Sequence, residues 1–151
     1  MKFKDNINTW IFDLDNTLYS ADSGIFQQVH RLMGEFISKN LNVDLTEAKK
    51  LQSKYYKQHG TTLRGMIDNH GTNPDHFLEE VHKLDYSIVG PNDLLNKELK
   101  KLEGRKIIYT NANKKHVIDV LERINLTNFF DEIFDLKMAN YIPKPEIKPY
   151  E

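Results

Sequence analysis

The sequence contains no cysteine among its 151 residues. This absence excludes a disulfide-based scaffold, thiolate zinc sites and a cysteine nucleophile. Neither sign of charge dominates, because 21 lysines and arginines stand against 22 acidic residues and the formal net charge is −1. Such a balance gives no electrostatic support for nucleic acid or an anionic membrane as the main partner, and we expect neither.

Long apolar runs are also missing. No stretch approaches the roughly 18 apolar residues of a membrane span, and the polar start Met1–Asn6 lacks the apolar region of a secretion signal. We therefore expect a cytoplasmic protein. With 151 residues, the chain can bury one core and a small inserted module, but it is too short for two full domains.

The most informative segment is Trp10–Tyr19, in which an apolar, strand-like run ends in Asp13 and Asp15. If the strand continues to that point, residues two apart face the same side, so both carboxylates enter one small volume. Their repulsion must be offset by a cation, a cationic side chain or a shared proton, and each is an ingredient of phosphoryl-transfer chemistry. Two other interpretations are a solvated strand end and a calcium loop, although Leu18 occupies the loop position that requires glycine.

Helical patterns fill the next part of the chain. Apolar residues at helical spacing, capping residues and terminal glycines predict four successive helices. They are expected over residues 25–37 with Asp22 or Ser23 as the cap, from Asp44 with Glu47 to Gly60, over 63–69, and from the cap Asn73 with Pro74 onward. Residues 20–88 are therefore predicted to form an all-helical insert.

Strand-like sequence returns after this insert. The expected elements are a helix over 92–102, a buried parallel strand over 105–109, a helix over 114–124 with Val117, Ile118, Leu121 and Ile124 on one face, and a third strand over 132–136. This order predicts a doubly wound α/β fold with a parallel, Rossmann-like sheet. We expect residues 1–19 and 89–151 to form this core and 20–88 to form a cap.

Two further motifs follow the predicted second and third strands, where sites gather in such folds. Thr110-Asn111 comes directly before a helix, so a hydroxyl and main-chain N–H groups could hold a phosphate. Lys144 stands between Pro143 and Pro145, which restrict the local backbone and suit a cation that must point at one place. Read alone, Thr110-Asn111 is also typical of a helix cap and Lys144 of a surface lysine.

In this order the motifs resemble those of the haloacid dehalogenase superfamily. The segment Asp13–Thr17 resembles its first motif, Thr110-Asn111 its second and Lys144 its third. The helical insert resembles the four-helix cap type. Three stretches, at 55–65, 81–82 and 109–114, look most like the pyrimidine 5′-nucleotidase branch.

The resemblance implies a Mg²⁺-dependent hydrolase of phosphate monoesters, with nucleoside 5′-monophosphates favoured as substrates. Asp13 would be the nucleophile that forms an aspartyl-phosphate, and Asp15 the general acid and base. Mg²⁺ would bind the Asp13 carboxylate and the Asp15 main-chain carbonyl, while Thr110, Asn111 and Lys144 would hold the phosphate. In the cap, Tyr56 and Arg64 could contact the substrate's base or sugar, although aromatic residues at helical spacing are also typical of packing. Members that cleave carbon–halogen bonds lack the second acid.

One part of the superfamily pattern is missing. Its fourth motif, an acidic pair that completes the Mg²⁺ shell, should follow the lysine by a few tens of residues, but the sequence ends at Glu151. We therefore expect a fragment of a longer gene product, or a shortened relative. In this fold the strand with that motif lies beside the first strand, so its absence would leave 10–14 as an apolar edge that could pair with a second copy. Two alternatives to a nucleotidase therefore stay open. One is a phosphatase of phosphoglycolate or a sugar phosphate, and the other is a non-catalytic module that pairs through this edge.

Overall fold

The computed structural model describes residues 8–151, which form two compact units. The first unit comprises residues 8–23 and Tyr86–Asp135, and the second comprises Gly24–Asp85 and Leu136–Glu151. The amino-terminal segment that we expected to be polar and without a signal lies outside the described residues. Among residues 8–151, none of the helices has both the length and the apolar character needed to cross a lipid bilayer.

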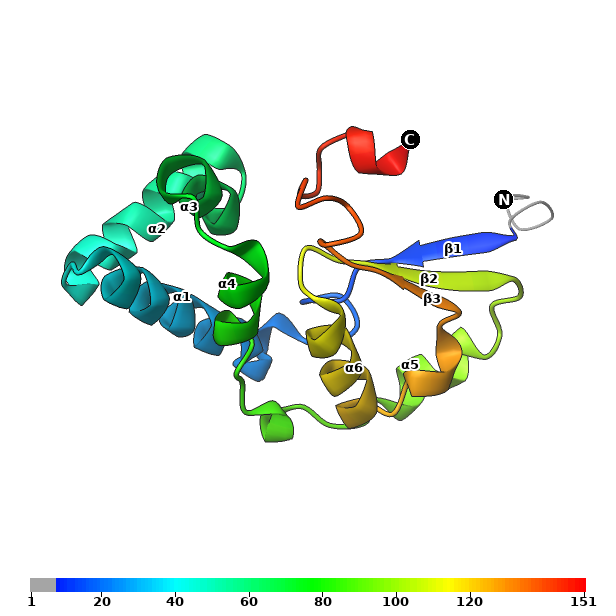
Figure 1. Cartoon of the computed structure of the whole chain (residues 1–151). Coiled ribbons are helices and arrows are strands. Elements are labelled where there is room, and N and C mark those ends of the chain that lie inside the picture. The colour runs from blue at the N-terminus through cyan, green and yellow to red at the C-terminus, as the bar shows by residue number, and fades with distance from the viewer. Residues whose placement is uncertain (1–7) are drawn as a thin grey trace. The chain divides into compact units, whose positions relative to one another are not determined.

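A parallel sheet forms the centre of the first unit. In the described part of the chain it has three strands in the order β1-β2-β3, namely β1 (Thr9–Phe12), β2 (Arg105–Tyr109) and β3 (Glu132–Phe134). The strands run in the same direction (Figure 1), with Phe12 beside Ile108 and Tyr109 beside Phe134. The predicted α/β fold class with a parallel sheet is therefore confirmed.

Both outer strands are shorter than the sequence indicates. β1 ends at Phe12, before the two acids, because Asn16 adopts a left-handed backbone with φ 60° and the N–H groups of Thr17 and Leu18 turn back to the Leu14 carbonyl. β3 ends at Phe134, and the side chain of the following Asp135 accepts a hydrogen bond from the main-chain N–H of Lys114. The premise that strand alternation aligns Asp13 with Asp15 is thus wrong; a tight loop places them.

The helices of the first unit are α5 (Asp93–Leu99) and α6 (Lys114–Arg123), with single turns at η3 (Tyr86–Ile88) and η4 (Thr127–Phe129). α6 begins after Asn113, whose side chain accepts a hydrogen bond from the His116 N–H. Its buried face consists of His116, Val117, Val120, Leu121 and the following Ile124. The prediction that Ile118 belongs to this face is wrong, because Ile118 is 40% exposed. α5 is shorter than predicted, since Lys100–Leu102 close with successive turns.

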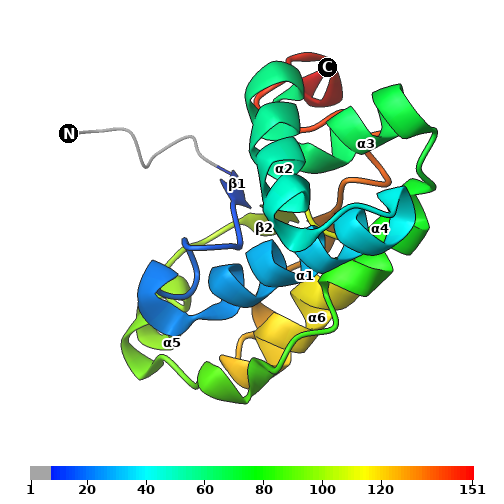
Figure 2. The same ribbon diagram turned by 90° about the vertical axis from the view of Figure 1, so that its left-hand side faces the viewer.

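Four helices dominate the second unit: α1 (Ile25–Leu41), α2 (Leu45–His59), α3 (Thr62–His70) and α4 (Pro74–Val81). Their shared core contains Phe36, Ile37, Tyr55, Met66 and Phe77. The α2 and α3 helices lie side by side in both views (Figures 1 and 2). The predicted order of four helices is confirmed.

Local capping explains where most of these helices begin and end. Asp44 accepts a hydrogen bond from the Glu47 N–H, Gly60 ends α2, and Asn73 accepts one from the His76 N–H, all as predicted. The predicted cap of α1 by Asp22 or Ser23 is wrong. Those residues form the single turn η2 (Ala21–Ser23), and α1 starts after Gly24, which has φ 93° and gives no side-chain cap.

A side-chain clasp joins the two ends of the helical segment. The Gln28 amide Nε2 donates to the Asp85 carbonyl at 3.1 Å, and its Oε1 accepts from the Asp85 N–H at 2.9 Å. Gln28 lies in the first turns of α1, whereas Asp85 is the last residue before the chain returns to the first unit. The point of entry and the point of exit are therefore bound to each other.

The carboxy-terminal segment groups with the helices. Leu136 and Tyr141 pack against the helical core. Asp75 in α4 accepts hydrogen bonds from Lys137 Nζ at 2.6 Å and from the Tyr141 hydroxyl at 2.7 Å. The segment ends in the single turn η5 (Lys148–Tyr150). These contacts explain why Leu136–Glu151 belongs to the second unit, while the assignment of 20–88 to a cap and 89–151 to a core stays a prediction.

Candidate functional site

Two carboxylates with different surroundings follow β1. Asp13 is exposed, and its Oδ2 accepts a hydrogen bond of 3.0 Å from the Thr17 hydroxyl four residues later. Leu14, between the acids, is fully buried and anchors the loop. Asp13 is thus presented at the surface of the first unit by a loop that its own neighbours hold closed.

Two side chains meet one oxygen of Asp15. The Tyr19 hydroxyl donates to Asp15 Oδ1 at 2.5 Å, and Nε2 of His116 lies 2.7 Å from the same atom. His116 is only 1% exposed and Tyr19 is 8% exposed. The second acid is therefore bound from its own loop and from α6.

The network extends by one residue. The Tyr86 hydroxyl, in η3, lies 2.8 Å from His116 Nδ1. Burial and the nearby charge of Asp15 raise the pKa of Tyr19, and burial and the charges of Asp119 and Asp15 raise the pKa of Tyr86. Both tyrosines consequently keep their protons and act as donors. In the tautomer with the proton on Nε2, His116 accepts from Tyr86 and donates to Asp15.

Thr110 and Asn111 follow β2, next to the end of β1. Thr110 is 1% exposed, its N–H donates to the Phe134 carbonyl and its Oγ1 accepts from the Ala112 N–H at 3.0 Å. A hydroxyl that accepts one hydrogen bond still has a proton to donate. The structure thus brings Asp13, Asp15, Thr110 and Asn111 to the ends of two paired parallel strands.

Several N–H groups near the start of α6 are already bound within the protein. Asp135, which is buried, accepts from the Lys114 N–H at 2.9 Å, and Asn113 accepts from the His116 N–H. Asp135 also places a negative charge where the helix dipole favours one. An expected phosphate grip at this helix start would therefore rely on Thr110 and Asn111 more than on the first turn of α6.

Lys144 belongs to the second unit, whereas the acids belong to the first. It is partly buried, and the preceding Asn140 and Tyr141 both have a left-handed backbone, with φ 52° and 58°. Tyr141 is held by Asp75, so the segment that leads to Lys144 is anchored to α4. The convergence of Lys144 with Asp13 and Asp15 stays a prediction.

The two cap candidates differ in their contacts. Tyr56 is 64% exposed on α2. Arg64 forms two contacts with Asp68, from Nε at 3.1 Å and from Nη2 at 2.8 Å, and His59 Nδ1 lies 3.1 Å from the same carboxylate. These contacts, led by the Arg64 hydrogen bond, lower the pKa of Asp68. Arg64 would have to exchange this carboxylate for a substrate group, and the binding role of both residues stays a prediction.

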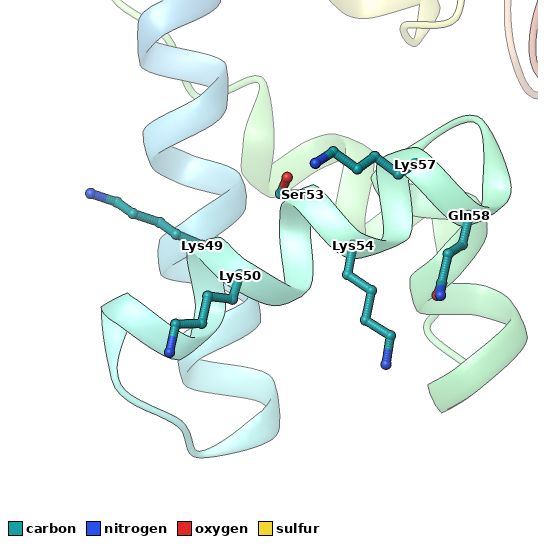
Figure 3. A pocket seen from close by; sticks show the side chains of 6 residues that line it. All are labelled: Lys49, Lys50, Ser53, Lys54, Lys57 and Gln58. Atoms are coloured by element: carbon teal, nitrogen blue, oxygen red, sulfur yellow. The ribbon is translucent and has the colours of Figure 1, made fainter.

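A basic surface on α2 does not form part of this arrangement. A shallow hollow there is lined by Lys49, Lys50, Ser53, Lys54, Lys57 and Gln58. Figure 3 shows that the ends of the lysine side chains spread in different directions. Since the charged ends do not converge on one point, this surface is a solvated helix face and not a binding site for a single small anion.

The donor atoms at the end of β1 suit Mg²⁺ in kind. Carboxylate and carbonyl oxygens are the ligands that this ion prefers, and Asp13 with the main-chain carbonyl of Asp15 offers both. Within residues 8–151, no three acidic or histidine side chains gather as a metal-binding group. The described residues therefore fit the ion as two protein ligands, with the other positions left to water or substrate oxygens.

Sequence reasoning missed the roles of His116, Tyr19, Tyr86 and Asp135. A signal for His116 was present, because it shares the helical spacing of Val117, Val120 and Leu121 and so falls on the buried face of α6. A histidine in an apolar stripe needs a polar partner. The sequence does not reveal that this partner is Asp15, which lies 101 residues earlier.

Comparison with known proteins gives a consistent assignment. Residues 10–151 match the family of haloacid dehalogenase-like hydrolases. Among curated proteins, the chain is 26% identical over 159 aligned residues to Phosphate metabolism protein 8 of Saccharomyces cerevisiae, an alignment that covers 94% of this chain and 49% of that protein. The chain thus spans about half the length of this curated relative.

Solved structures give the same fold. The HAD-hydrolase YfnB of Bacillus subtilis, bound to magnesium, is 17% identical with a TM-score of 0.51, and the match covers 95% of this chain and 69% of that one. L-2-haloacid dehalogenase of Xanthobacter autotrophicus is 17% identical with a TM-score of 0.50, covering 95% of this chain and 62% of that one. At such identities these likenesses establish the fold alone.

Proposed function

Because the chain belongs to the family of haloacid dehalogenase-like hydrolases, we propose that it supplies the nucleophile and the acid–base group of a Mg²⁺-dependent phosphate monoester hydrolase. The observation that carries this proposal is the contrast between the two acids after β1. Asp13 is exposed, with its Oδ2 accepting from the Thr17 hydroxyl, whereas Asp15 lies against the buried Tyr19 and His116 pair. One carboxylate is thus accessible for attack and the other is held in place for proton transfer.

In the proposed reaction, an Asp13 oxygen attacks phosphorus and the bond between phosphorus and the leaving oxygen breaks. The proton of Asp15 passes to that leaving oxygen. Water then attacks the phosphorus of the aspartyl-phosphate and its proton passes to Asp15; the bond between phosphorus and the Asp13 oxygen breaks, which releases inorganic phosphate and restores the Asp13 carboxylate. General acid and base catalysis of this kind typically contributes about 10²- to 10⁴-fold in rate.

The remaining predicted residues have supporting roles in this proposal. The Thr110 hydroxyl, Asn111 and Lys144 would hold the oxygens of the transferring group. Asp13 and the main-chain carbonyl of Asp15 would hold Mg²⁺, which when bound neutralises charge on the nucleophile and on the phosphoryl oxygens. With two protein ligands from the described residues, we expect weak binding of the ion.

The presence of Asp15 favours a phosphatase over a dehalogenase. The chain resembles the phosphatase members of the superfamily at this position, because members that cleave carbon–halogen bonds lack the second acid. The name of the yeast relative, Phosphate metabolism protein 8, agrees with this choice. The proposed activity is therefore phosphate ester hydrolysis and not the cleavage of a carbon–halogen bond, although an L-2-haloacid dehalogenase shares the fold.

For the substrate, we propose nucleoside 5′-monophosphates, because three stretches of the sequence resemble the pyrimidine 5′-nucleotidase branch. Tyr56 and Arg64 are the candidate contacts to base or sugar. Phosphoglycolate or a sugar phosphate is the alternative substrate class, since these activities differ in the cap. A second candidate function, a module that pairs through β1, is favoured by one observation: Ile11 on that edge strand is 63% exposed.

The test is phosphate release from a panel of nucleoside monophosphates, phosphoglycolate and sugar phosphates, with and without Mg²⁺. It should use both the 151-residue chain and a longer gene product that carries it. We expect Mg²⁺-dependent release that Asp13→Asn abolishes, whereas the matched change Asp93→Asn, in the first turn of α5, leaves it unchanged. Equal turnover by wild type and Asp13→Asn would rule out this nucleophile.

A further inference from the structure

A partly buried hydrogen-bond network links three segments of the first unit. It runs from Tyr86 in η3 to His116 in α6 and then to Asp15 after β1, with contacts of 2.8 Å and 2.7 Å. Tyr19 adds a bond of 2.5 Å to the same Asp15 oxygen. These hydrogen bonds therefore join residues that are distant in sequence but lie within one compact unit.

Packing alone does not explain a histidine at position 116. Its neighbours on the buried face of α6, Val117, Val120 and Leu121, are apolar and at most 3% exposed. Burying an imidazole among them costs free energy unless its nitrogens are hydrogen-bonded. Here both nitrogens have partners, so the ring is held in one orientation.

The two contacts to Asp15 converge on Oδ1. One comes from Tyr19, four residues later, and the other from His116 in α6. Such a pair fixes the plane of the carboxyl group and not merely its position. A group that must give a proton to a leaving oxygen and later take one from water needs this restraint, because small misplacements of a reacting group cost much of the rate. In this network Tyr86 acts through His116, because a hydroxyl that donates to Nδ1 leaves the proton of the ring on Nε2.

We propose that His116 is a positioning residue for Asp15 and that Tyr86 acts through His116 by fixing its tautomer. The inference rests on the proposed acid–base role of Asp15 and extends it to residues that no motif of the sequence indicated. A purely structural staple between α6 and the loop after β1 would use the same contacts. The two roles predict different effects on turnover when the contacts of His116 are removed.

The kinetic test compares His116→Leu, His116→Gln and Tyr86→Phe with wild type on the best phosphate monoester of the panel. We expect His116→Leu to lower kcat by roughly 10- to 100-fold with little change in KM, since a hydrogen bond to a charged group is lost. His116→Gln keeps a donor near the Nε2 position and should recover part of the loss. Tyr86→Phe removes one hydroxyl only and should show a smaller loss.

The decisive comparison uses Asp15→Asn as a background. If His116 acts through Asp15, His116→Leu lowers the residual rate no further in that background. An equal loss in both backgrounds, or unchanged kcat in His116→Leu, would overturn the inference. Thermal unfolding of each variant identifies changes in rate that come from lost folding.

A second measurement does not depend on activity. In ¹⁵N-histidine NMR spectra of the 151-residue chain, Nε2 of His116 should carry a proton and Nδ1 should not, and Tyr86→Phe should shift the ring nitrogens. A proton on Nδ1 instead would overturn the inference. A wild-type chain that releases no phosphate in an Asp13-dependent way counts against the proposed function, while the NMR result still decides the hydrogen-bond network.

Discussion

At the scale of single residues, charge pairs hold parts of the chain that the sequence keeps apart. Asp75 at the start of α4 binds both Lys137 and Tyr141 of the carboxy-terminal segment. The hydrogen bond from Lys137 and then that from Tyr141 lower the pKa of Asp75, and burial opposes them. The folded protein therefore binds a proton at this carboxyl less readily than the unfolded chain does.

This shift predicts how the contact responds to pH. Because the pKa of Asp75 is lower in the folded state, its contribution is fully present above the unfolded value of about 3.9 and is lost as the pH falls through the folded value. We expect Lys137→Met to lower the free energy of unfolding by about 0.5 kcal/mol at neutral pH, a small effect because Asp75 is partly exposed.

Denaturant unfolding at several pH values measures this effect. The difference between wild type and Lys137→Met should shrink as the pH is lowered from about 7 to about 2.5. Lys54→Met is the matched control, since Lys54 lies on the exposed basic face of α2, and it should give no pH-dependent difference. A difference that grows toward acid would contradict the assigned sign.

At the scale of elements, the contact between α2 and α3 depends on a glycine. A Cβ on Gly65 would lie 2.3 Å from Cβ of Tyr55, much closer than side-chain atoms approach each other. Gly34 in α1 is also helical, but a Cβ there would meet its nearest atom, Gln52 Oε1, at 3.6 Å, an ordinary contact distance. The two glycines form a matched pair, one required by packing and the other not.

We therefore expect opposite effects from one substitution at the two sites. Gly65→Ala should destabilise the protein by about 1 to 3 kcal/mol, because α3 must move away from α2. Gly34→Ala should be neutral or stabilising by up to about 1 kcal/mol, because alanine favours a helix more than glycine does. Thermal or denaturant unfolding of both variants decides the matter, and a stabilised Gly65→Ala would refute the close approach.

Elements whose limits are set locally were predictable. Asp44, Asn73 and Gly60 act within a few residues, so their capping roles can be recognised in the sequence and are found in the structure. Features set by distant residues were not predictable. Ile118 was assigned to the buried face of α6, which instead turns His116 inward toward Asp15. β3 ends at Phe134, and the next side chain, Asp135, binds the start of α6.

The same distinction applies to the candidate site. The positions of Asp13, Asp15, Thr110 and Asn111 after two neighbouring strands follow from the order of the elements, so the sequence was sufficient to find them. The reason given for the acid pair was wrong, since a loop with Asn16 at φ 60° holds the acids after β1 has ended. The distant partner of Asp15, His116, could be identified only from the three-dimensional fold.

At the scale of the whole molecule, the sheet formed by the described residues leaves β1 at one edge. The exposed apolar residue Ile11 lies on this strand, and such edges favour pairing with another chain. We expect the 151-residue chain to associate at high concentration and Ile11→Lys to reduce this association. Light scattering over a concentration series measures it, with Ile147→Lys as a control on an isoleucine outside the sheet that is 72% exposed. Identical behaviour of wild type and Ile11→Lys would exclude β1 as the contact.

The Gln28 clasp has a consequence for how this polypeptide could be rebuilt. Its two hydrogen bonds hold Asp85 against the first turns of α1, so the long excursion between them begins and ends at one place. A short bridging peptide could span that place at little entropic cost, because closing a loop costs more as the loop lengthens. The segment from 24 to 85 could thus be exchanged only together with Leu136–Glu151, which shares its core.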